Sequence, residues 1–276
     1  MDVAESILSG EAVAVLDGDM SEALVTDVAG GRAAIYSSRS PAKDPPNEDA
    51  AAIIPIDAEC AVLAVADGCG GHAAGEQAAR LAIEVLHRRL TMIDDPSGGV
   101  RGAILDAFEI ANREIDELGV GAATTLAVAE IRGDGVRTYH TGDTDILVTG
   151  QRGRVKLQTL AHAPTAYAVE AGVMNEQDAM HHDDRALISN ILGSSDMRVD
   201  VGSAMALARR DTLLLASDGV TDNLWTREIV DAIRIGALPV AAQRLASAAR
   251  QRMTSPSDGE PSKPDDTTFI LFRRSG

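Results

Sequence analysis

Two pairs of long amphipathic segments divide the apolar runs of this chain into groups, and this order constrains the fold more than any other feature. Ala74–Leu90 and Val100–Leu118 carry apolar side chains at helical spacing, and Thr226–Ile235 and Pro239–Arg252 form a second such pair. Short runs that are continuously apolar or alternate with period two surround these helices. They predict strands at Ala33–Ser37, Ala50–Ile56, Ala61–Ala66, Thr124–Ile131, Val136–Thr141, Ile146–Thr149, Val155–Leu160, Asp211–Ser217 and Thr267–Arg273.

This order of strands and helix pairs predicts two packed antiparallel sheets with a helix pair outside each, a fold of the α+β class. The four runs between Thr124 and Leu160 are expected to form an antiparallel meander, because Gly-containing turns separate them. Residues 162–197 interrupt the alternation with short helical pieces and a polar surface, which predicts an inserted subdomain anchored by His162. Since no internal repeat and no long Pro/Gly linker occurs, residues 1–276 are expected to form one domain.

The composition argues against several classes of partner. The 276 residues include 42 Asp and Glu against 25 Lys and Arg, and a net charge of -17 repels phosphate backbones and anionic lipid. Aromatic residues make up only 3% of the chain, which argues against stacking platforms for nucleic acid. The two cysteines form no disulfide framework, and no apolar run reaches the about 18 residues that span a bilayer. We therefore expect a cytoplasmic protein that binds neither nucleic acid nor membranes.

Several carboxylates stand where predicted strands begin or end. Asp67 and Asp218 each follow a strongly apolar run and precede a glycine, Asp143 follows another strand, and Glu48 and the pair Asp265–Asp266 precede strands. Because strand ends are rigid, such carboxylates can converge from distant parts of the chain. Converging oxygen ligands are what Mg²⁺ and Mn²⁺ require. Asp-Gly is also a common turn dipeptide, so the residues alone leave a metal site and simple turns as comparable interpretations.

Six short stretches around these acids follow one another in an order typical of a known family. They are Asn47–Asp49, Ala64–His72, Gly121–Thr125, Gly142–Thr144, Leu215–Asp222 and Asp265–Thr268. Through them the chain resembles the metal-dependent (PPM, type 2C) serine/threonine protein phosphatases from about residue 32 to residue 273. The resemblance implies the family's four-layer α-β-β-α sandwich, which agrees with the order of elements. It also identifies the segment from about residue 162 to 197 as the flap subdomain of bacterial members.

The resemblance implies a metal-binding role for most of the acids. Asp67 would bridge two Mn²⁺ or Mg²⁺ ions, with Asp218 and Asp265 on the first ion. Glu48 and the backbone carbonyl of Gly68 would bind the second ion. Two such cations generate a bridging hydroxide at neutral pH, which hydrolyses phosphoserine and phosphothreonine without a covalent phosphoenzyme.

A third and weaker ion is known in bacterial relatives. By resemblance Asp143, with Asp218 and Asp222, would hold it, so two or possibly three ions are expected in total. The implied substrates are phosphorylated proteins, the products of a serine/threonine kinase. We expect the enzyme to be a monomer.

Three positions depart from the family's pattern. The arginine that usually binds the substrate phosphate, four residues before the metal-binding glutamate, is replaced by Asp44. Lys43 is nearest to that position, whereas Arg39 is the better chemical match because a guanidinium binds phosphate in a bidentate way. Together with Asp67, these two are the catalytic candidates, and position favours Lys43. Cys69 replaces the family's His or Met and is interpreted as packing, and Thr144–Asp145 replaces the usual Ser-Arg.

The missing arginine leaves a second hypothesis of another class. A pseudophosphatase would keep the fold and act as a binding module without catalysis. The retained metal-binding acids argue against it. A phosphatase dedicated to an anti-sigma-factor antagonist is a third hypothesis, but such proteins commonly carry sensor domains, for which a chain of 276 residues has no room.

Overall fold

Two antiparallel sheets form the centre of the computed structural model, which describes residues 11–43, 46–69, 73–94, 98–119 and 121–275. The first sheet, in spatial order, is β1 (Val13–Leu16), β4 (Asp49–Asp57), β5 (Cys60–Cys69), β7 (Leu126–Arg132), β8 (Gly135–Thr141) and β11 (Asp200–Val201), with β6 (Ala123–Thr124) paired to β5 and β12 (Met205–Ala206) paired to β8. The second sheet is β10 (Val155–Gln158), β9 (Asp145–Thr149), β13 (Thr212–Ala216), β14 (Thr267–Arg274), β3 (Gly31–Ser38) and β2 (Leu24–Val28).

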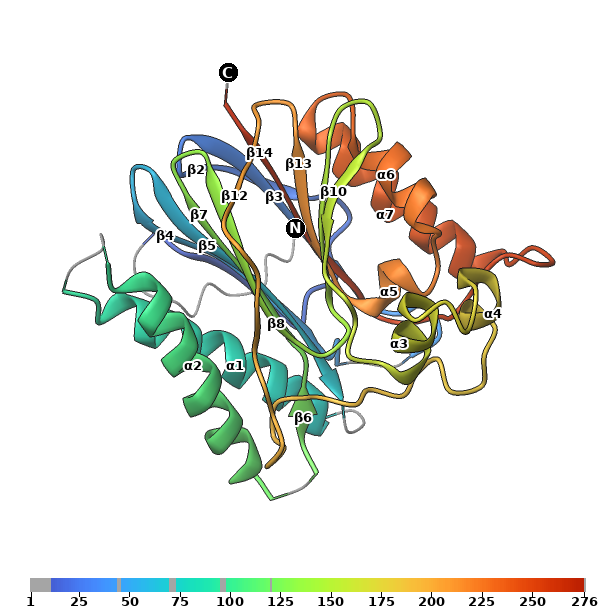
Figure 1. Ribbon diagram of the computed structural model, residues 1–276, viewed down its shortest axis with the longest axis horizontal. Coiled ribbons are helices and arrows are strands. Elements are labelled where there is room, and N and C mark those ends of the chain that lie inside the picture. Colours follow the sequence, from blue (N-terminus) through green and yellow to red (C-terminus); the bar gives the residue numbers. More distant parts are fainter. Residues whose placement is uncertain (1–10, 44–45, 70–72, 95–97, 120, 276) are drawn as a thin grey trace.

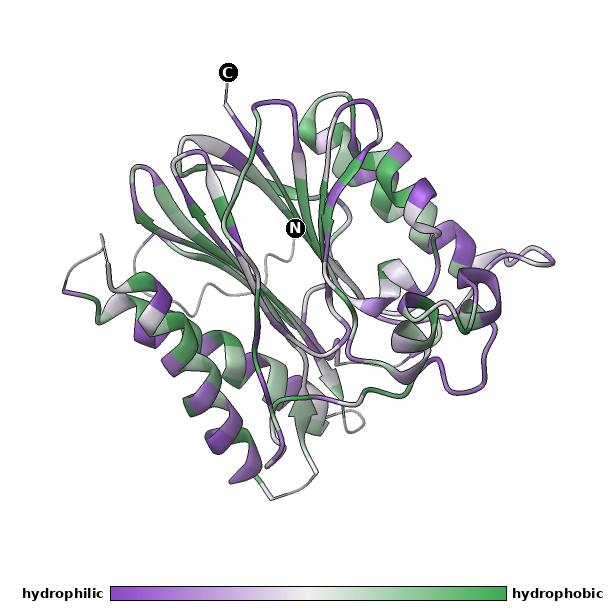
Figure 2. Cartoon of the chain, in the orientation of Figure 1, coloured by the Kyte–Doolittle hydropathy of each residue, from purple (hydrophilic) through white to green (hydrophobic). Residues whose placement is uncertain are grey.

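Helices cover the outer face of each sheet. The pair α1 (Ala73–Thr91) and α2 (Val100–Asp116) packs on the first sheet, and α6 (Thr226–Ile233) and α7 (Leu238–Thr254) pack on the second (Figure 1). Apolar residues on the strands, and on the helix faces that meet them, form the layers between these elements, while polar residues lie on the outer helix faces (Figure 2). The predicted four-layer sandwich of the α+β class is confirmed.

The alternation of side chains along the strands explains why three apolar layers form. On β3, Ala33 and Ile35 face the layer between the two sheets, whereas Ala34 and Tyr36 face the layer under α6 and α7. Successive side chains of a strand point to opposite faces, so a strand that is apolar on both faces must be covered on both. The strands are continuously apolar in sequence because both of their faces are buried.

The predicted single meander is wrong. Strands β7 and β8 pair with each other in the first sheet, but β9 and β10 belong to the second sheet. The chain crosses between the sheets at residues 142–144, where Gly142 has a φ of 101° that favours glycine. Asp143 lies on this crossing. The separate strands β1 and β2 and the short helix α5 (Asp218–Thr221) were not anticipated by the sequence pattern.

The flap joins the first sheet to the second along one end of the sandwich. Its regular parts are the short helices α3 (Pro164–Glu170) and α4 (Glu176–Met180), and its return passes Leu192, which forms a β-bridge with Thr124. The chain then pairs with β8 through β11. The C-terminal part of the flap is therefore attached to the first sheet. The flap helices lie beside α5 (Figure 1).

Candidate metal centre

Acidic residues from separate segments converge at the end of the sandwich that carries the flap. They line a cavity of about 150 Å³ together with two lysines. Strand pairing contributes to this convergence, because the register of β4 and β5 places Asp49 opposite Asp67. The cavity is lined by Lys43, Glu48, Asp49, Asp67, Gly68, Cys69, Asp143, Ala186, Ile188, Asp218, Lys263, Asp265 and Asp266.

The sequence alone allowed both Asp-Gly pairs to be simple turns, but neither pair forms a turn in the structure. Strand β5 continues through Gly68 and Cys69, which pair with Thr124 and Ala123 of β6. A Cβ at Gly68 would lie 2.3 Å from the carbonyl oxygen of Gly75 and 2.6 Å from that of Glu48, so only glycine fits there. The second pair, Asp218 and Gly219, begins helix α5. Both pairs therefore hold a carboxylate against closely packed backbone.

Burial, followed by the crowding of like charges, raises the pKa of several acids in this cluster. Burial, together with the neighbouring charges of Asp218 and Asp49, raises the pKa of Asp67 well above its usual value. Burial raises the pKa of Asp218 to about 7, although Lys263 opposes the shift. Burial and the charge of a nearby aspartate, Asp222, raise the pKa of Asp143 to about 6. These carboxyl groups need cations to remain ionised together at neutral pH.

Two lysines supply part of this positive charge. The Nζ atom of Lys43 lies 2.7 Å from Asp265 Oδ1 and 3.2 Å from Glu48 Oε2. That of Lys263 forms an ion pair with Asp218 and lies 3.0 Å from Asp222 Oδ2 and 3.3 Å from Asp265 Oδ2.

Between them, the two lysines override the effect of burial on one carboxyl group. Burial alone would raise the pKa of Asp265, yet the hydrogen bond from Lys43 and the charge of Lys263 hold it below its usual value. The sequence analysis missed Lys263, which lies in a polar loop without any local signal.

Other carboxylate oxygens in the cavity have no such partner. Among the described residues, Glu48 Oε1 and Asp143 Oδ1 are buried without a hydrogen-bond donor. The side chain of Asp67 accepts one long hydrogen bond, of 3.4 Å, from the amide of Asp218. Buried anionic oxygens without donors are costly unless a cation binds them. An all-oxygen set of this kind fits a hard divalent cation.

The structure separates the two candidates for phosphate binding. Lys43 lines the cavity, whereas the guanidinium of Arg39 donates to Asp17 Oδ1 at 3.3 Å and does not line it. Asp44, which replaces the family's arginine, lies outside the described residues. Cys69 lines the cavity, and its Sγ lies 3.8 Å from the carbonyl oxygen of Asp67. Burial and the charge of Asp67 raise the pKa of Cys69, so its sulfur is a neutral thiol.

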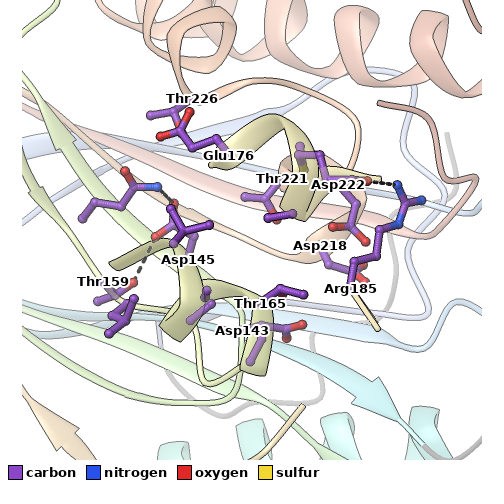
Figure 3. A pocket seen from close by; sticks show the side chains of 18 of the residues that line it. Asp143, Asp145, Thr159, Thr165, Glu176, Arg185, Asp218, Thr221, Asp222 and Thr226 are labelled. Atoms are coloured by element: carbon purple, nitrogen blue, oxygen red, sulfur yellow. Dashed lines mark hydrogen bonds between the residues drawn. The ribbon is translucent and has the colours of Figure 1, made fainter. Parts of the chain in front are cut away.

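A larger cavity of about 430 Å³ adjoins this cluster and shares Asp143 and Asp218 with it. Its walls come from α3 and α4 of the flap and from the segment that contains Asp222 and Thr226 (Figure 3). Asp222 lies in this second cavity and reaches the first cluster through Lys263.

A histidine cluster at the base of the flap was only partly anticipated. The rings of His140 and His162 stack with centroids 4.6 Å apart, and both lie near Asp200. His140 and His162 are buried, while the side chain of Asp200 is 53% exposed. Two histidines and a carboxylate this close could hold a transition metal. The hydrogen bonds of His162 show whether a ring nitrogen is available to bind such a metal.

The tautomer of His162 argues against a metal at this cluster. Its Nδ1 accepts a hydrogen bond from the Gly142 amide at 3.1 Å and lies 2.7 Å from Asn190 Nδ2. The Asn190 amide is oriented by its two bonds to the backbone of Arg198. The ring proton is therefore on Nε2, which faces Asp200 Oδ2 at 3.1 Å, and no lone pair remains for a metal. His162 anchors the flap, as predicted.

Comparison with known proteins places this site in a family. The model of the family "Protein phosphatase 2C" matches residues 39–255. The chain belongs to the protein phosphatase 2C family. It is 31% identical over 213 residues to the serine/threonine protein phosphatase PstP of Mycobacterium tuberculosis, an alignment that covers 72% of this chain and 38% of PstP. The chain thus spans well under half the length of that relative.

Solved structures agree with this assignment. The serine/threonine phosphatase of S. agalactiae superimposes with a TM-score of 0.76 at 26% identity, covering 88% of this chain and 99% of that one. The catalytic domain of PstP in complex with two manganese ions gives a TM-score of 0.69 at 25% identity and covers 88% and 97%. The family is metal-dependent, and the relatives' names are those of serine/threonine phosphatases. Among the described residues, no helix has both the length and the apolar character needed to cross a membrane.

Proposed function

We propose that this chain is a single phosphatase catalytic domain that hydrolyses phosphoserine and phosphothreonine in proteins with bound Mn²⁺ or Mg²⁺. The observation that carries the proposal is the convergence of seven carboxylates from separate segments on one small cavity. Two of their buried oxygens, on Glu48 and Asp143, lack a donor among the described residues. Family membership supports the same reaction.

The proposed ligands follow the arrangement of the acids. Asp67, Asp218 and Asp265 would hold a first ion, and Asp67, Glu48 and the carbonyl of Gly68 would hold a second. Asp143 and Asp222 together with Asp218 would hold a third, weaker ion. When bound, such ions lower the pKa of a coordinated water and neutralise charge on the phosphoryl group during in-line attack.

The chain's own residues orient the substrate around these ions. Lys43 is the proposed contact to an outer phosphate oxygen, because its ammonium already lies in the cavity and carries a charge that the phosphate needs. Arg39 is the weaker candidate, because its guanidinium pairs with Asp17 and does not line the cavity. Cys69 needs no proton-transfer role in this scheme.

The proposed substrates are phosphorylated proteins, the products of a serine/threonine kinase in the cytoplasm, and the proposed working unit is a monomer. An excess of acidic over basic residues, with a net charge of -17, supports the absence of nucleic-acid and membrane partners.

Phosphate release from a phosphothreonine peptide tests the proposal. We expect turnover with Mn²⁺ and none with excess chelator, and a pseudophosphatase would release no phosphate in either case. At saturating Mn²⁺, Lys43→Ala should raise KM for the phosphopeptide. The Mn²⁺ affinity, measured separately by calorimetry, should rise, because Lys43 contacts the proposed ligands Asp265 and Glu48. Arg39→Ala is the matched control and should leave both unchanged. If neither variant, nor the two combined, alters KM or kcat, neither residue holds the phosphate.

A further inference from the structure

The larger cavity beside the metal centre combines apolar walls with acidic groups. Its apolar side consists of Leu160 and of side chains from the flap and the α6 region, which include Val169, Met180, Trp225 and Ile229. Its charged groups comprise six carboxylates and one guanidinium. Figure 3 labels Asp143, Asp145, Glu176, Asp218, Asp222 and Arg185, and Glu170 is the sixth acid. Lys263 contacts Asp218 and Asp222, and these two and Asp143 are proposed metal ligands. The acidic character that remains for a guest comes from Asp145, Glu170 and Glu176.

Arg185, the one arginine among the described residues that line the cavity, does not neutralise these acids. Arg185 donates to the backbone carbonyl oxygens of Met180 at 2.7 Å and Ser262 at 3.5 Å. Within the described part of the chain, neither Glu170 nor Glu176 has a hydrogen bond to its side chain or an ion pair. Both are exposed at the rim, on the helices α3 and α4. Their charges are free to meet a cation that enters from solvent.

Deeper in the cavity lies a carboxylate that only neutral groups satisfy. Asp145 is buried and accepts hydrogen bonds from Gln158 Nε2 and Thr159 Oγ1, each at 3.0 Å. A buried acid without a cationic partner favours a cationic guest.

These features together describe one kind of occupant. A side chain with an apolar stem and a cationic head places the stem against apolar walls and the head beside carboxylates. The indole of Trp225 can add a cation–π contact. The volume of about 430 Å³ is ample for one such side chain.

We propose that this cavity binds an arginine or lysine side chain of the phosphoprotein substrate, close in sequence to the phosphorylated residue. The proposal rests on the proposed function, because it takes the neighbouring metal centre as the place where phosphate is cleaved. The two cavities share Asp143 and Asp218, so they adjoin each other. An extended peptide spans about 3.3–3.6 Å per residue, and the basic residue therefore lies within a few positions of the phosphoresidue. The preferred substrates are therefore basic phosphopeptides.

Matched peptides test this preference. A phosphothreonine peptide with arginine at each of the three positions on either side, one at a time, is compared with the same peptide carrying norleucine, which keeps the apolar stem. We expect kcat/KM to be about tenfold higher for arginine at one or two positions, and the ratio to fall as salt is raised. Equal values for arginine and norleucine at all positions would overturn the proposal.

Variants at the exposed rim localise the effect. Glu170→Lys combined with Glu176→Lys should reduce the arginine preference to about one, and the milder Glu→Gln pair should reduce it partly. Asp183→Lys is the control, because Asp183 is an exposed flap acid that does not line the cavity. All variants should hydrolyse p-nitrophenyl phosphate at the native rate, since this small ester does not reach the cavity. A preference that survives in the rim variants would contradict the assignment.

Binding without turnover separates this inference from the proposed function. Trp225 is the only tryptophan of the chain, so its fluorescence reports on this cavity. An unphosphorylated arginine peptide should change the fluorescence of the native protein. Its Kd for the native protein should be at least about fivefold lower than its Kd for the rim variant, and at least about fivefold lower than the Kd of the norleucine peptide for the native protein. Such binding in a protein that hydrolyses no phosphoester would refute the phosphatase proposal alone, and no difference between the peptides would refute the cavity proposal alone.

Discussion

Replacement of Lys263 by methionine should destabilise the metal-free protein and make it more responsive to Mn²⁺. The ammonium contacts Asp218, Asp222 and Asp265, so the variant leaves three carboxylates facing one another without their shared cation. Methionine keeps much of the length and apolar surface of the lysine stem. The change therefore removes charge with little loss of packing.

The burial of these groups sets the size of the effect. The side chains of Lys263, Asp218 and Asp222 are 25%, 18% and 17% exposed, which places them between a buried pair and a surface pair. Removal of one partner of a fully buried pair costs about 3–5 kcal/mol, whereas a surface pair contributes about 0–1 kcal/mol. We expect a loss of about 2–3 kcal/mol in chelator at pH 8, or a fall in Tm of about 4–10 °C.

The loss should depend on pH with a defined sign. A carboxyl group with a native pKa above its unfolded value favours the folded state fully below the unfolded pKa, and this contribution is lost as the pH rises through the native pKa. Burial raises the pKa of Asp218 to about 7 although Lys263 lowers it, so the variant pKa is higher still. Protonation relieves the repulsion at pH 5. The Tm difference between native and variant should therefore grow from pH 5 to pH 8.

Thermal unfolding with chelator and with Mn²⁺ measures both effects. Mn²⁺ supplies the missing positive charge, so it should raise the Tm of Lys263→Met by more than that of the native protein. Lys156→Met is the control, because Lys156 pairs with the buried Asp211 at 2.6 Å and neither residue lines the metal cavity. Its Tm deficit should be the same with and without Mn²⁺. An equal response of the two variants to Mn²⁺ would refute the reasoning.

Three further substitutions test separate parts of the site. Asp67→Asn should abolish Mn²⁺-dependent phosphate release while circular dichroism shows a native fold, and sustained turnover would remove the dinuclear scheme. Cys69→Ser should keep kcat within several-fold of native, because loss of a general acid would cost about 10²–10⁴-fold. Burial raises the pKa of Asp145 from 3.8 to about 6, a cost of about 3 kcal/mol that appears as the pH rises from about 4 to above 6. Asp145→Asn should therefore flatten the fall in stability over this pH range, measured by chemical denaturation in chelator, and an unchanged slope would contradict the assigned cause.

The apolar strands could be predicted because double burial leaves a strong signal in the sequence. A run such as Ala61–Ala66 has no polar face, so it must lie inside a sheet that is covered on both sides. Strand β2, by contrast, is half exposed at a sheet edge and contains Asp27, so its pattern resembles a loop. The failed meander has a similar cause. The step from β8 to β9 contains an ordinary Gly-Asp pair, and only contacts distant in sequence decide that it crosses between sheets.

The sequence motifs predicted the acidic residues of the candidate site but not the lysine between them. The acids Glu48, Asp67 and Asp218 are recognisable because each stands at a fixed place beside a buried strand. Lys263 is not, because it lies in a loop rich in Ser, Pro, Gly and Asp, where a lysine is normally a solvated surface residue. Its contact with Asp218, 45 positions away in the sequence, arises from tertiary structure alone.

Positive charge is redistributed around this centre relative to the family's pattern, and the redistribution links the site to the neighbouring cavity. The sequence has aspartate at positions 44 and 145, where the family usually has arginine, while the ammonium groups of Lys43 and Lys263 contact the acidic cluster. An ammonium is a point charge and lacks the bidentate geometry of a guanidinium, so it positions a phosphate less specifically. With a weaker hold on the phosphate itself, selectivity must come more from contacts to the rest of the substrate. An acidic cavity beside the metal centre supplies such contacts, and a substrate that carries its own arginine would provide the guanidinium that this chain lacks.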